Sequence, residues 1–137
     1  RMHYNLILTG DFNSPKNEMR NGEIVTWGQK VKPSGEVVAA VNSKWRKVCT
    51  GERWDRAERS IIQNHTKLGL EDAFRSVNEI SDDSMSWVTR KGVGRRYDHI
   101  FCSRQNRVIE AFYDAEPRAK NLSDHSPLIS VIELNVN

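Results

Sequence analysis

Three short apolar runs, each ended or interrupted by an acidic residue, most constrain what this chain can fold into. The acids are Asp11 after Leu6–Leu8, Asp98 inside Tyr97–Phe101, and Asp124 ahead of Leu128–Leu134. Runs of this length that break at Gly, Asn or Pro predict buried strands that feed loops. An acid inside such a run is costly unless a cation or an imidazole partners it. The pattern therefore predicts acidic side chains at the ends of three strands, where they can meet.

The polar residues around these acids form three motifs. In chain order they are Gly10-Asp11-Phe12-Asn13, Arg96-x-Asp98-x-Ile100 and Ser123-Asp124-His125-x-Pro127. In this order they resemble the motifs of the endonuclease/exonuclease/phosphatase family, whose best-known members are of the exonuclease III and DNase I types. Two intervening segments, Leu70–Arg75 and Ser86-Trp87, also resemble that family, so the resemblance spans essentially all 137 residues.

The resemblance implies an α/β fold, the C-terminal half of a DNase I-like four-layered sandwich. Its sheet is expected to be mostly antiparallel or mixed, with helices on one face. Residues 1–137 then form one half-domain, because the family's opening half, which carries a strand-end Asn and a metal-binding Glu, is absent ahead of Gly10. A lone sheet with an uncovered apolar face should pair with something. We expect the partner to be the missing N-terminal half or a self-associated copy.

Length and composition fit one domain with a real core, since 37% of the 137 residues are hydrophobic. No apolar stretch approaches the roughly 20 residues of a membrane-spanning helix, and the opening residues lack a signal-peptide pattern. We therefore expect no membrane partner, and a cytoplasmic location is favoured. The net charge of +3 permits a polyanionic partner without requiring one. Cys49 and Cys102 lack the spacing of a zinc or dithiol site and are expected to be reduced packing residues.

Periodicity and turn residues predict the elements of the first third of the chain. We expect a strand over residues 3–9, buried through its leucines, and a long loop over 14–32. A helix is predicted over 34–48 with Gly51 as its stop, although the Val-rich start also permits a strand.

A second helix is predicted over 53–68 and ended by Gly69. Its expected buried stripe is Trp54, Ala57, Ile61, His65 and Leu68. Its basic residues, Arg53, Arg56, Arg59 and Lys67, are expected on a solvated face, with phosphate contact as the alternative.

The last third of the chain reads as strands joined by turns. A short strand over 85–89 is expected to pair with 97–100 across a glycine-containing turn at 90–94. The remaining expected elements are a strand over 108–114, a loop over 116–121 and a strand over 128–134.

By the resemblance, five residues are candidates for a hydrolytic site. His125 is expected to contact the scissile phosphate or the attacking water, with Asp98 orienting and charging its ring. Asp11 is assigned to water activation or to a metal ion, and Asn13 to amide donation towards the phosphate. Asp124 is the remaining metal ligand. Mg²⁺, or Mn²⁺, is the implied cofactor, because Mg²⁺ is often held by one or two carboxylates together with substrate phosphate.

Substrate binding is assigned to Asn13, Trp87, Arg95 and Arg96. Trp87 either lines the substrate groove or packs in the core. The two arginines belong to a basic turn that also holds Arg90 and Lys91, and this turn is either ordinary solvated charge or a phosphate contact.

Each candidate also has a local explanation. Asp11 and Asn13 could form a turn, Asp98 could pair with Arg96, and Asp124 could cap a turn. Structural roles are assigned to three other residues: His99, which strand alternation turns away from Asp98, His65 on the second helix, and Trp27, for which base stacking is the alternative.

The function expected from these residues is Mg²⁺-dependent hydrolysis of phosphodiester bonds, in nucleic acid before other substrates. One alternative keeps the site but makes the substrate a phosphomonoester, such as an inositol or sugar phosphate. The other alternative is a catalytically incomplete fragment that acts as a binding or assembly module, since the family's metal-binding Glu is missing.

Overall fold

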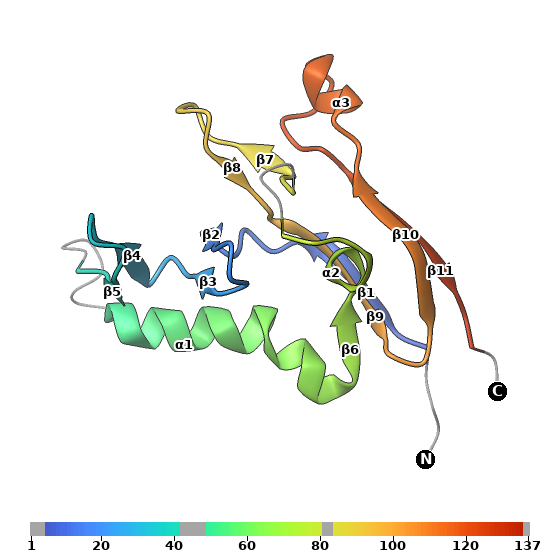
Figure 1. Cartoon of the computed structure of the whole chain (residues 1–137), viewed down its shortest axis with the longest axis horizontal. Helices are drawn as coiled ribbons and strands as arrows, with labels where there is room; N and C mark the ends of the chain where they lie inside the picture. The colour runs from blue at the N-terminus through green and yellow to red at the C-terminus, as the bar shows by residue number, and fades with distance from the viewer. Residues whose placement is uncertain (1–4, 42–48, 81–83, 136–137) are drawn as a thin grey trace.

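The computed structural model describes residues 5–41, 49–80 and 84–135 of the chain (Figure 1). It is an α/β structure of mixed helices and small sheets, and every strand pair in the described residues is antiparallel. This agrees with the α/β expectation and with a mostly antiparallel sheet. No helix in the described ranges is both long and apolar enough to cross a bilayer.

A three-stranded sheet forms the centre of the structure, with the order β1 (Ile7–Asp11), β9 (Asp98–Ser103) and β6 (Leu70–Asp72). β9 lies in the middle and is the most buried of the three, with Phe101 and Cys102 almost fully enclosed. In the register of β1 and β9, Asp11 lies opposite Asp98. The central pairing therefore brings two of the predicted motifs to the same end of the sheet.

The predicted strands at 108–114 and 128–134 are confirmed as β10 (Arg107–Tyr113) and β11 (Leu128–Glu133), which pair with each other. The short helix α2 (Ala73–Val77) begins at Asp72, whose carboxylate accepts hydrogen bonds from two backbone N–H groups of its first turn. α2 contacts both β9 and β10, so it packs against the central sheet and against the β10–β11 pair. A further short helix, α3 (Glu116–Ala119), occupies the segment expected to be a loop.

The segment expected to be a loop over 14–32 contains three short strands, β2 (Asn17–Glu18), β3 (Ile24–Val25) and β4 (Gln29–Val31). β4 pairs with β5 (Val37–Ala39), so the helix predicted from residue 34 is wrong over its described part. Gly35 makes the tight turn between them with a φ of 86°. The Val-rich segment at 37–39 is thus a strand, which was the alternative to the predicted helix. The last part of the predicted helix, 42–48, lies outside the described residues.

The second predicted helix is present as α1 (Gly51–Ile62), followed by a 3₁₀ turn, η1 (Asn64–Leu68), which ends at Gly69 in the left-handed conformation. The predicted buried face is wrong: Trp54 is 40% exposed and Ile61 57% exposed, whereas Glu58 and Ile62 are buried. Glu58 is buried because it accepts hydrogen bonds from Ser14 Oγ, the Trp27 backbone N–H and Trp54 Nε1 at 2.5, 2.8 and 3.1 Å.

Gly51, expected to stop a helix, instead opens α1 at a close approach to β4. A Cβ added to Gly28 would lie 2.3 Å from the Gly51 carbonyl oxygen, and a Cβ on Gly51 would lie 2.5 Å from the Ala40 carbonyl oxygen. The two glycines therefore allow the start of α1 to pack directly on backbone.

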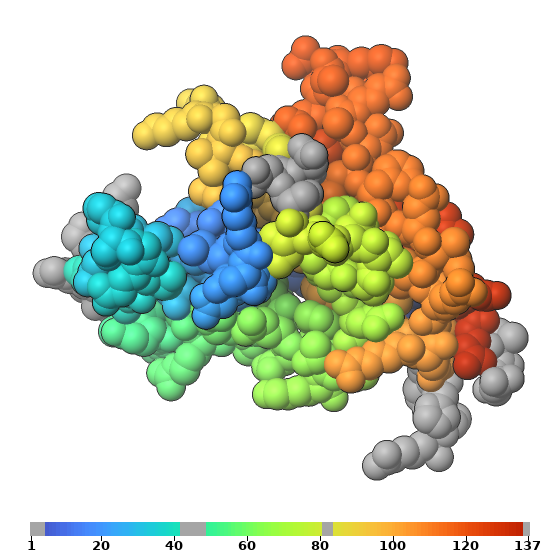
Figure 2. Space-filling model, viewed as in Figure 1, coloured from blue at the N-terminus to red at the C-terminus, as the bar shows by residue number. Residues whose placement is uncertain are grey.

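The strand expected at 85–89 is shortened to β7 (Trp87–Val88), and it pairs with β8 (Gly94–Arg95) rather than with 97–100. The reason is that the two edges of β9 are already taken by β1 and β6. The resulting β7–β8 hairpin and the α3 segment project from the rest of the molecule (Figure 2). Of the two free cysteines, Cys102 is buried in β9 as expected of a packing residue, whereas Cys49 is half-buried.

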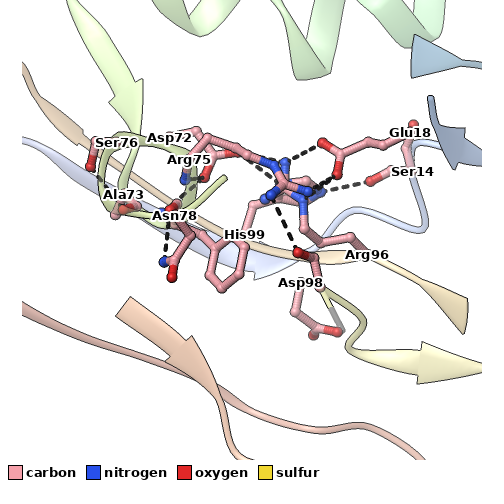
Figure 3. A network of polar contacts seen from close by, with 12 residues as sticks. Ser14, Glu18, Asp72, Ala73, Arg75, Ser76, Asn78, Arg96, Asp98 and His99 are labelled. Carbon is pink, nitrogen blue, oxygen red and sulfur yellow. Dashed lines mark hydrogen bonds and ion pairs between the residues drawn. The ribbon is translucent and has the colours of Figure 1, made fainter. Parts of the chain in front are cut away.

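Arg96, between β8 and β9, is the centre of a buried charge network (Figure 3). Its side chain is 5% exposed, and one guanidinium nitrogen lies 2.8 Å from a Glu18 oxygen and 2.7 Å from Asp72 Oδ2. Arg75 of α2 also pairs with Glu18. His99 is buried beside this network, with Nε2 2.7 Å from the Ser14 carbonyl oxygen. The network joins β2, β6, α2 and β9 around one cation.

Apolar side chains remain exposed on β1 and on the β10–β11 hairpin. The exposed residues are Leu6, Ile7 and Leu8 on and beside β1, and Ile109, Phe112, Ile129 and Val131 on the hairpin. The prediction that the leucines of the first strand are buried is therefore wrong, with exposures of 51% and 44%. The described sheet leaves one of its apolar surfaces without a cover from the described residues.

Replacing Arg96 by Met should destabilise the chain by about 3–5 kcal/mol, since Glu18 and Asp72 would then be buried without their shared cation. Urea unfolding followed by circular dichroism measures the change. The matched control is Arg107→Met, because Arg107 is 78% exposed and lies 3.9 Å from Glu133. The control should change stability by less than about 1 kcal/mol. An equal, small effect of both substitutions would contradict the role of the buried network.

Candidate functional site

The centre of the candidate site is a hydrogen bond between His125 and Asp98. His125 Nδ1 lies 2.7 Å from Asp98 Oδ2, and both side chains remain partly accessible, at 26% and 23% exposure. The ring makes no other hydrogen bond within the described part of the chain. A carboxylate on Nδ1 fixes that nitrogen as the protonated one and leaves Nε2 for other chemistry.

Strand pairing places Asp11 beside the Asp98–His125 pair, since Asp11 lies opposite Asp98 at the end of β1. Its carboxylate accepts the backbone N–H of Asn13 at 2.7 Å and the Asn13 side-chain amide at 3.3 Å. Asn13 has a φ of 50°, a left-handed conformation that Asn tolerates. The local turn weighed as an alternative for these two residues is therefore present, and it also fixes their position beside Asp98.

Three neighbouring carboxylates affect the pKa of His125. Partial burial acts to lower the pKa of His125, but the hydrogen bond and charge of Asp98 outweigh it. The charges of Asp11 and Asp124 act in the same direction as Asp98, so the pKa of His125 stands above its ordinary value of 6.5. The exposed Asp124 thus belongs to the same charge cluster, although it forms no hydrogen bond to the ring in the described residues.

The Asp98 backbone is held by two residues that the sequence patterns did not single out for this role. Ser86 Oγ is fully buried and accepts the backbone N–H groups of Tyr97 and Asp98 at 2.9 and 3.1 Å. Tyr113 Oη donates to the Asp98 carbonyl oxygen at 2.6 Å. The Ser86 carbonyl oxygen accepts the Ser126 N–H at 2.6 Å, which ties the His125 loop to the same residue.

Trp87 lies next to the candidate site. It forms an isolated β-bridge with His125, and its ring stacks on Tyr97 with centroids 5.6 Å apart. The Trp87 side chain is half-buried, so one part of it contributes to packing and another remains accessible.

The two arginines assigned to substrate binding lie elsewhere. Arg96 is held by Glu18 and Asp72, so the alternative in which it pairs with Asp98 is not found. Arg95 makes long hydrogen bonds of 3.5 Å to Asn17 Oδ1 and to the Gly94 carbonyl oxygen. The structure therefore brings together Asp11, Asn13, Asp98, Asp124, His125 and Trp87, and it directs Arg95 and Arg96 to a separate cavity.

Carboxylates lie near the candidate site, but those of the described residues do not form a ligand set for a metal ion. Within the described ranges no group of three or more His, Cys, Asp or Glu side chains is placed to hold a metal ion. Asp11 and Asp124 are carboxylates of the kind that Mg²⁺ prefers. They do not build a metal centre by themselves.

The other histidines and Trp27 have local partners. His99 is 2% exposed and contacts Ser14 and Asp72, on a different side of β9 from the Asp98–His125 pair. His65 stacks on Phe101 with centroids 4.1 Å apart, and burial outweighs nearby Asp72 to lower the pKa of His65. Trp27 Nε1 donates to the Asn13 carbonyl oxygen at 2.9 Å, so this Trp supports the turn after β1.

Comparison of the chain with known protein families, with curated proteins and with solved structures gave no match.

Replacing Asp98 by Asn should lower the pKa of His125 below its wild-type value, because the strongest interaction that holds the imidazolium is removed. NMR titration of the ring signals measures this pKa directly. A raised folded-state pKa stabilises the fold fully below the unfolded value near 6.5, and this stabilisation is lost as the pH rises through the folded pKa. The stability gap between wild type and Asp98→Asn should therefore be largest in acid.

The control for this titration is Glu133→Gln, which removes the same charge from an exposed position at the end of β11. It should leave the His125 titration unchanged. An identical His125 pKa in wild type and Asp98→Asn would show that the carboxylate does not charge the ring.

Proposed function

We propose that the chain hydrolyses phosphodiester bonds and that its substrate is nucleic acid. The supporting observation is the 2.7 Å contact between His125 and Asp98, with Asp11 opposite Asp98 on the neighbouring strand. Asp11 and His125 are more than a hundred positions apart in the sequence, and local turn formation does not require them to converge. The resemblance to the endonuclease/exonuclease/phosphatase motifs gives this convergence its chemical interpretation.

The proposal includes the finer fold, the C-terminal half of a DNase I-like sandwich. The antiparallel central sheet and the exposed apolar surfaces of β1 and the β10–β11 hairpin are compatible with a missing layer. In that arrangement the site would lie at the end of the sheet where β1 and β9 both carry an aspartate.

In the proposed reaction, a water oxygen forms a new bond to phosphorus and the bond to the leaving oxygen breaks. Asp11 is accessible and would accept the proton of the attacking water. His125, with its raised pKa, would place a positive imidazolium against the phosphate oxygens and would donate a proton to the leaving oxygen through Nε2. Asp98 would hold the ring orientation, and the Asn13 amide would donate to the phosphate.

Replacing His125 by Ala should reduce hydrolysis about 10²-fold or more, since the loss removes a catalytic acid and the charge beside the phosphate. Turnover is measured on nicked and abasic DNA and, in parallel, on inositol polyphosphates, which separates phosphodiester from phosphomonoester cleavage. Lys120→Ala is the control, because Lys120 lies in the same loop region and pairs only with exposed Glu116 in the described structure. Activity of His125→Ala above a tenth of wild type would contradict the assigned role.

A requirement for Mg²⁺ or Mn²⁺ remains part of the proposal and rests on the resemblance and on charge. Asp11, Asp98 and Asp124 outnumber the one imidazolium among them, so the cluster is net negative near neutral pH. A phosphate ester is itself negative and would be repelled by this cluster without an added cation.

EDTA should abolish hydrolysis, and excess MgCl₂ should restore it, because the added cation offsets that repulsion. The assay uses the intact chain and the better substrate of the two classes above. Asp124→Asn should raise the Mg²⁺ concentration needed for half-maximal activity, whereas Glu133→Gln should not. Full activity in EDTA would exclude the metal-dependent form of the proposal.

A second candidate function is favoured by the exposed apolar surfaces. A chain with Ile7 52% and Val131 50% exposed would gain stability from a covering layer. This supports the alternative in which the chain acts as an assembly module with the missing half-domain or a second copy. A wild-type chain without turnover on any phosphate ester would favour this alternative over hydrolysis.

A further inference from the structure

The proposed reaction does not involve Glu58, a buried acid on α1. Its carboxylate accepts hydrogen bonds from Ser14 Oγ, the Trp27 backbone N–H and Trp54 Nε1. A buried carboxylate is costly unless its oxygens are hydrogen-bonded, so these donors fix where the side chain lies. The carboxylate in turn fixes the position of the segments that carry the donors.

Two of these donors lead to Asn13. Ser14 follows Asn13 directly in the chain, and its Oγ lies 2.5 Å from Glu58 Oε1. Trp27 donates its backbone N–H to Glu58 Oε2 at 2.8 Å and its indole Nε1–H to the Asn13 carbonyl oxygen at 2.9 Å. Glu58 therefore holds the turn after β1 by two routes, one through Ser14 and one through Trp27.

The turn after β1 depends on such support. Asn13 has a φ of 50°, which is uncommon for a residue other than glycine. Asp11 and Asn13 are both exposed, so burial does not hold either side chain in place. Their carboxylate–amide contacts at 2.7 and 3.3 Å join them to each other. The position of the pair is therefore set by the backbone of the turn.

We propose that Glu58 is a positioning residue for the Asp11–Asn13 pair. By holding Ser14 and Trp27, it fixes the backbone that carries both side chains at the end of β1. The inference rests on the proposed function, in which Asp11 accepts a proton from water and Asn13 donates to the phosphate. Glu58 then affects the rate of hydrolysis through the placement of these two side chains.

The test begins with Glu58→Leu, which removes the carboxylate and keeps a side chain of similar size. Hydrogen exchange of the Asn13 backbone N–H, measured by NMR, should become about tenfold faster or more, because the turn opens more often. On nicked or abasic DNA, kcat should fall about 10- to 100-fold with KM changed less than about twofold. The reason is that a misplaced base and donor act on the reacting groups rather than on overall binding.

Glu58→Gln is the conservative variant. Its amide oxygen can accept from Trp27 and Trp54, and its amide nitrogen can donate to Ser14 Oγ, because a hydroxyl is both donor and acceptor. All three contacts are then kept, so Asn13 exchange and kcat should stay within about threefold of wild type. Equal effects of the Gln and Leu substitutions would overturn the proposal.

Asp55→Leu is the matched control on the same helix. Asp55 Oδ1 accepts from Thr26 Oγ1 and from Arg59 Nε, both at 2.8 Å, and neither donor belongs to the turn after β1. At a temperature where circular dichroism shows the variants folded, Asp55→Leu should leave Asn13 exchange and kcat unchanged. Equal acceleration of Asn13 exchange by Asp55→Leu would show that Glu58 has a merely structural role.

Ser14→Ala covers the case in which Glu58→Leu does not fold. It removes only the hydroxyl that donates to Glu58 Oε1, and it should also accelerate Asn13 exchange. Unchanged exchange in this variant would overturn the proposal.

The exchange measurement separates this inference from the proposed function, because it does not need turnover. Faster Asn13 exchange in Glu58→Leu, together with a wild-type chain that hydrolyses no phosphate ester, would support the hold of Glu58 on the turn and reject hydrolysis. Unchanged exchange would reject the positioning role even where the wild-type chain hydrolyses DNA.

Discussion

The rest of the structure depends on one buried cation. Arg96 carries a full charge with 5% of its side chain exposed, and burial acts to lower its pKa. The adjacent carboxylates of Asp72 and Glu18 outweigh that effect and hold the pKa of Arg96 above its ordinary value. Because those acids come from β6 and β2, the ion pairs fix two distant segments against the start of β9. Removing Arg96 would leave Asp72 and Glu18 buried without their shared cation.

This constraint also sets the geometry of the candidate site. With Arg96 anchored on one side of the chain, Asp98 begins β9 with its carboxylate turned to His125, and His99 is turned into the core. Alternation along β9 turns the neighbouring side chains of Asp98 and His99 to opposite faces. The buried set of charges around Arg96 stabilises the fold, and the accessible set around Asp98 at the sheet end remains available for chemistry. Within the sequence Arg96-Tyr97-Asp98-His99, Arg96 and His99 thus stabilise the fold, and Asp98 belongs to the candidate site.

The parts of the fold that could be predicted from sequence are those set by local pattern. Alternation and turn residues predicted β10 and β11, and periodicity with Gly69 predicted the extent of α1 and its 3₁₀ turn. The buried face of α1 could not be predicted in this way. It is decided by Glu58, an acid that becomes buried only because Ser14, Trp27 and Trp54 donate to it. The periodicity of the helix sequence does not indicate these hydrogen-bond partners, because they do not depend on apolar spacing.

The candidate site could likewise be predicted only where sequence motifs indicated it. The motifs predicted that Asp11, Asp98 and His125 would converge, and the register of β1 with β9 places them at one end of the sheet. Ser86 and Tyr113 hold the Asp98 backbone through hydrogen bonds whose partners are 12 and 15 residues away, which no local pattern indicates. Arg95 and Arg96 were expected beside the acids because they adjoin Asp98 in the sequence. Their side chains line the separate cavity with Arg20 and Arg75.

The acids around His125 also decide what a phosphate ester would meet at the candidate site. The charges of Asp98, Asp11 and Asp124 all act on the His125 ring in the same direction. The same three carboxylates would repel a phosphate ester placed beside them. In the hydrolytic proposal, the imidazolium and an added cation would offset that repulsion, so the acids that charge the ring would also create the need for the cation.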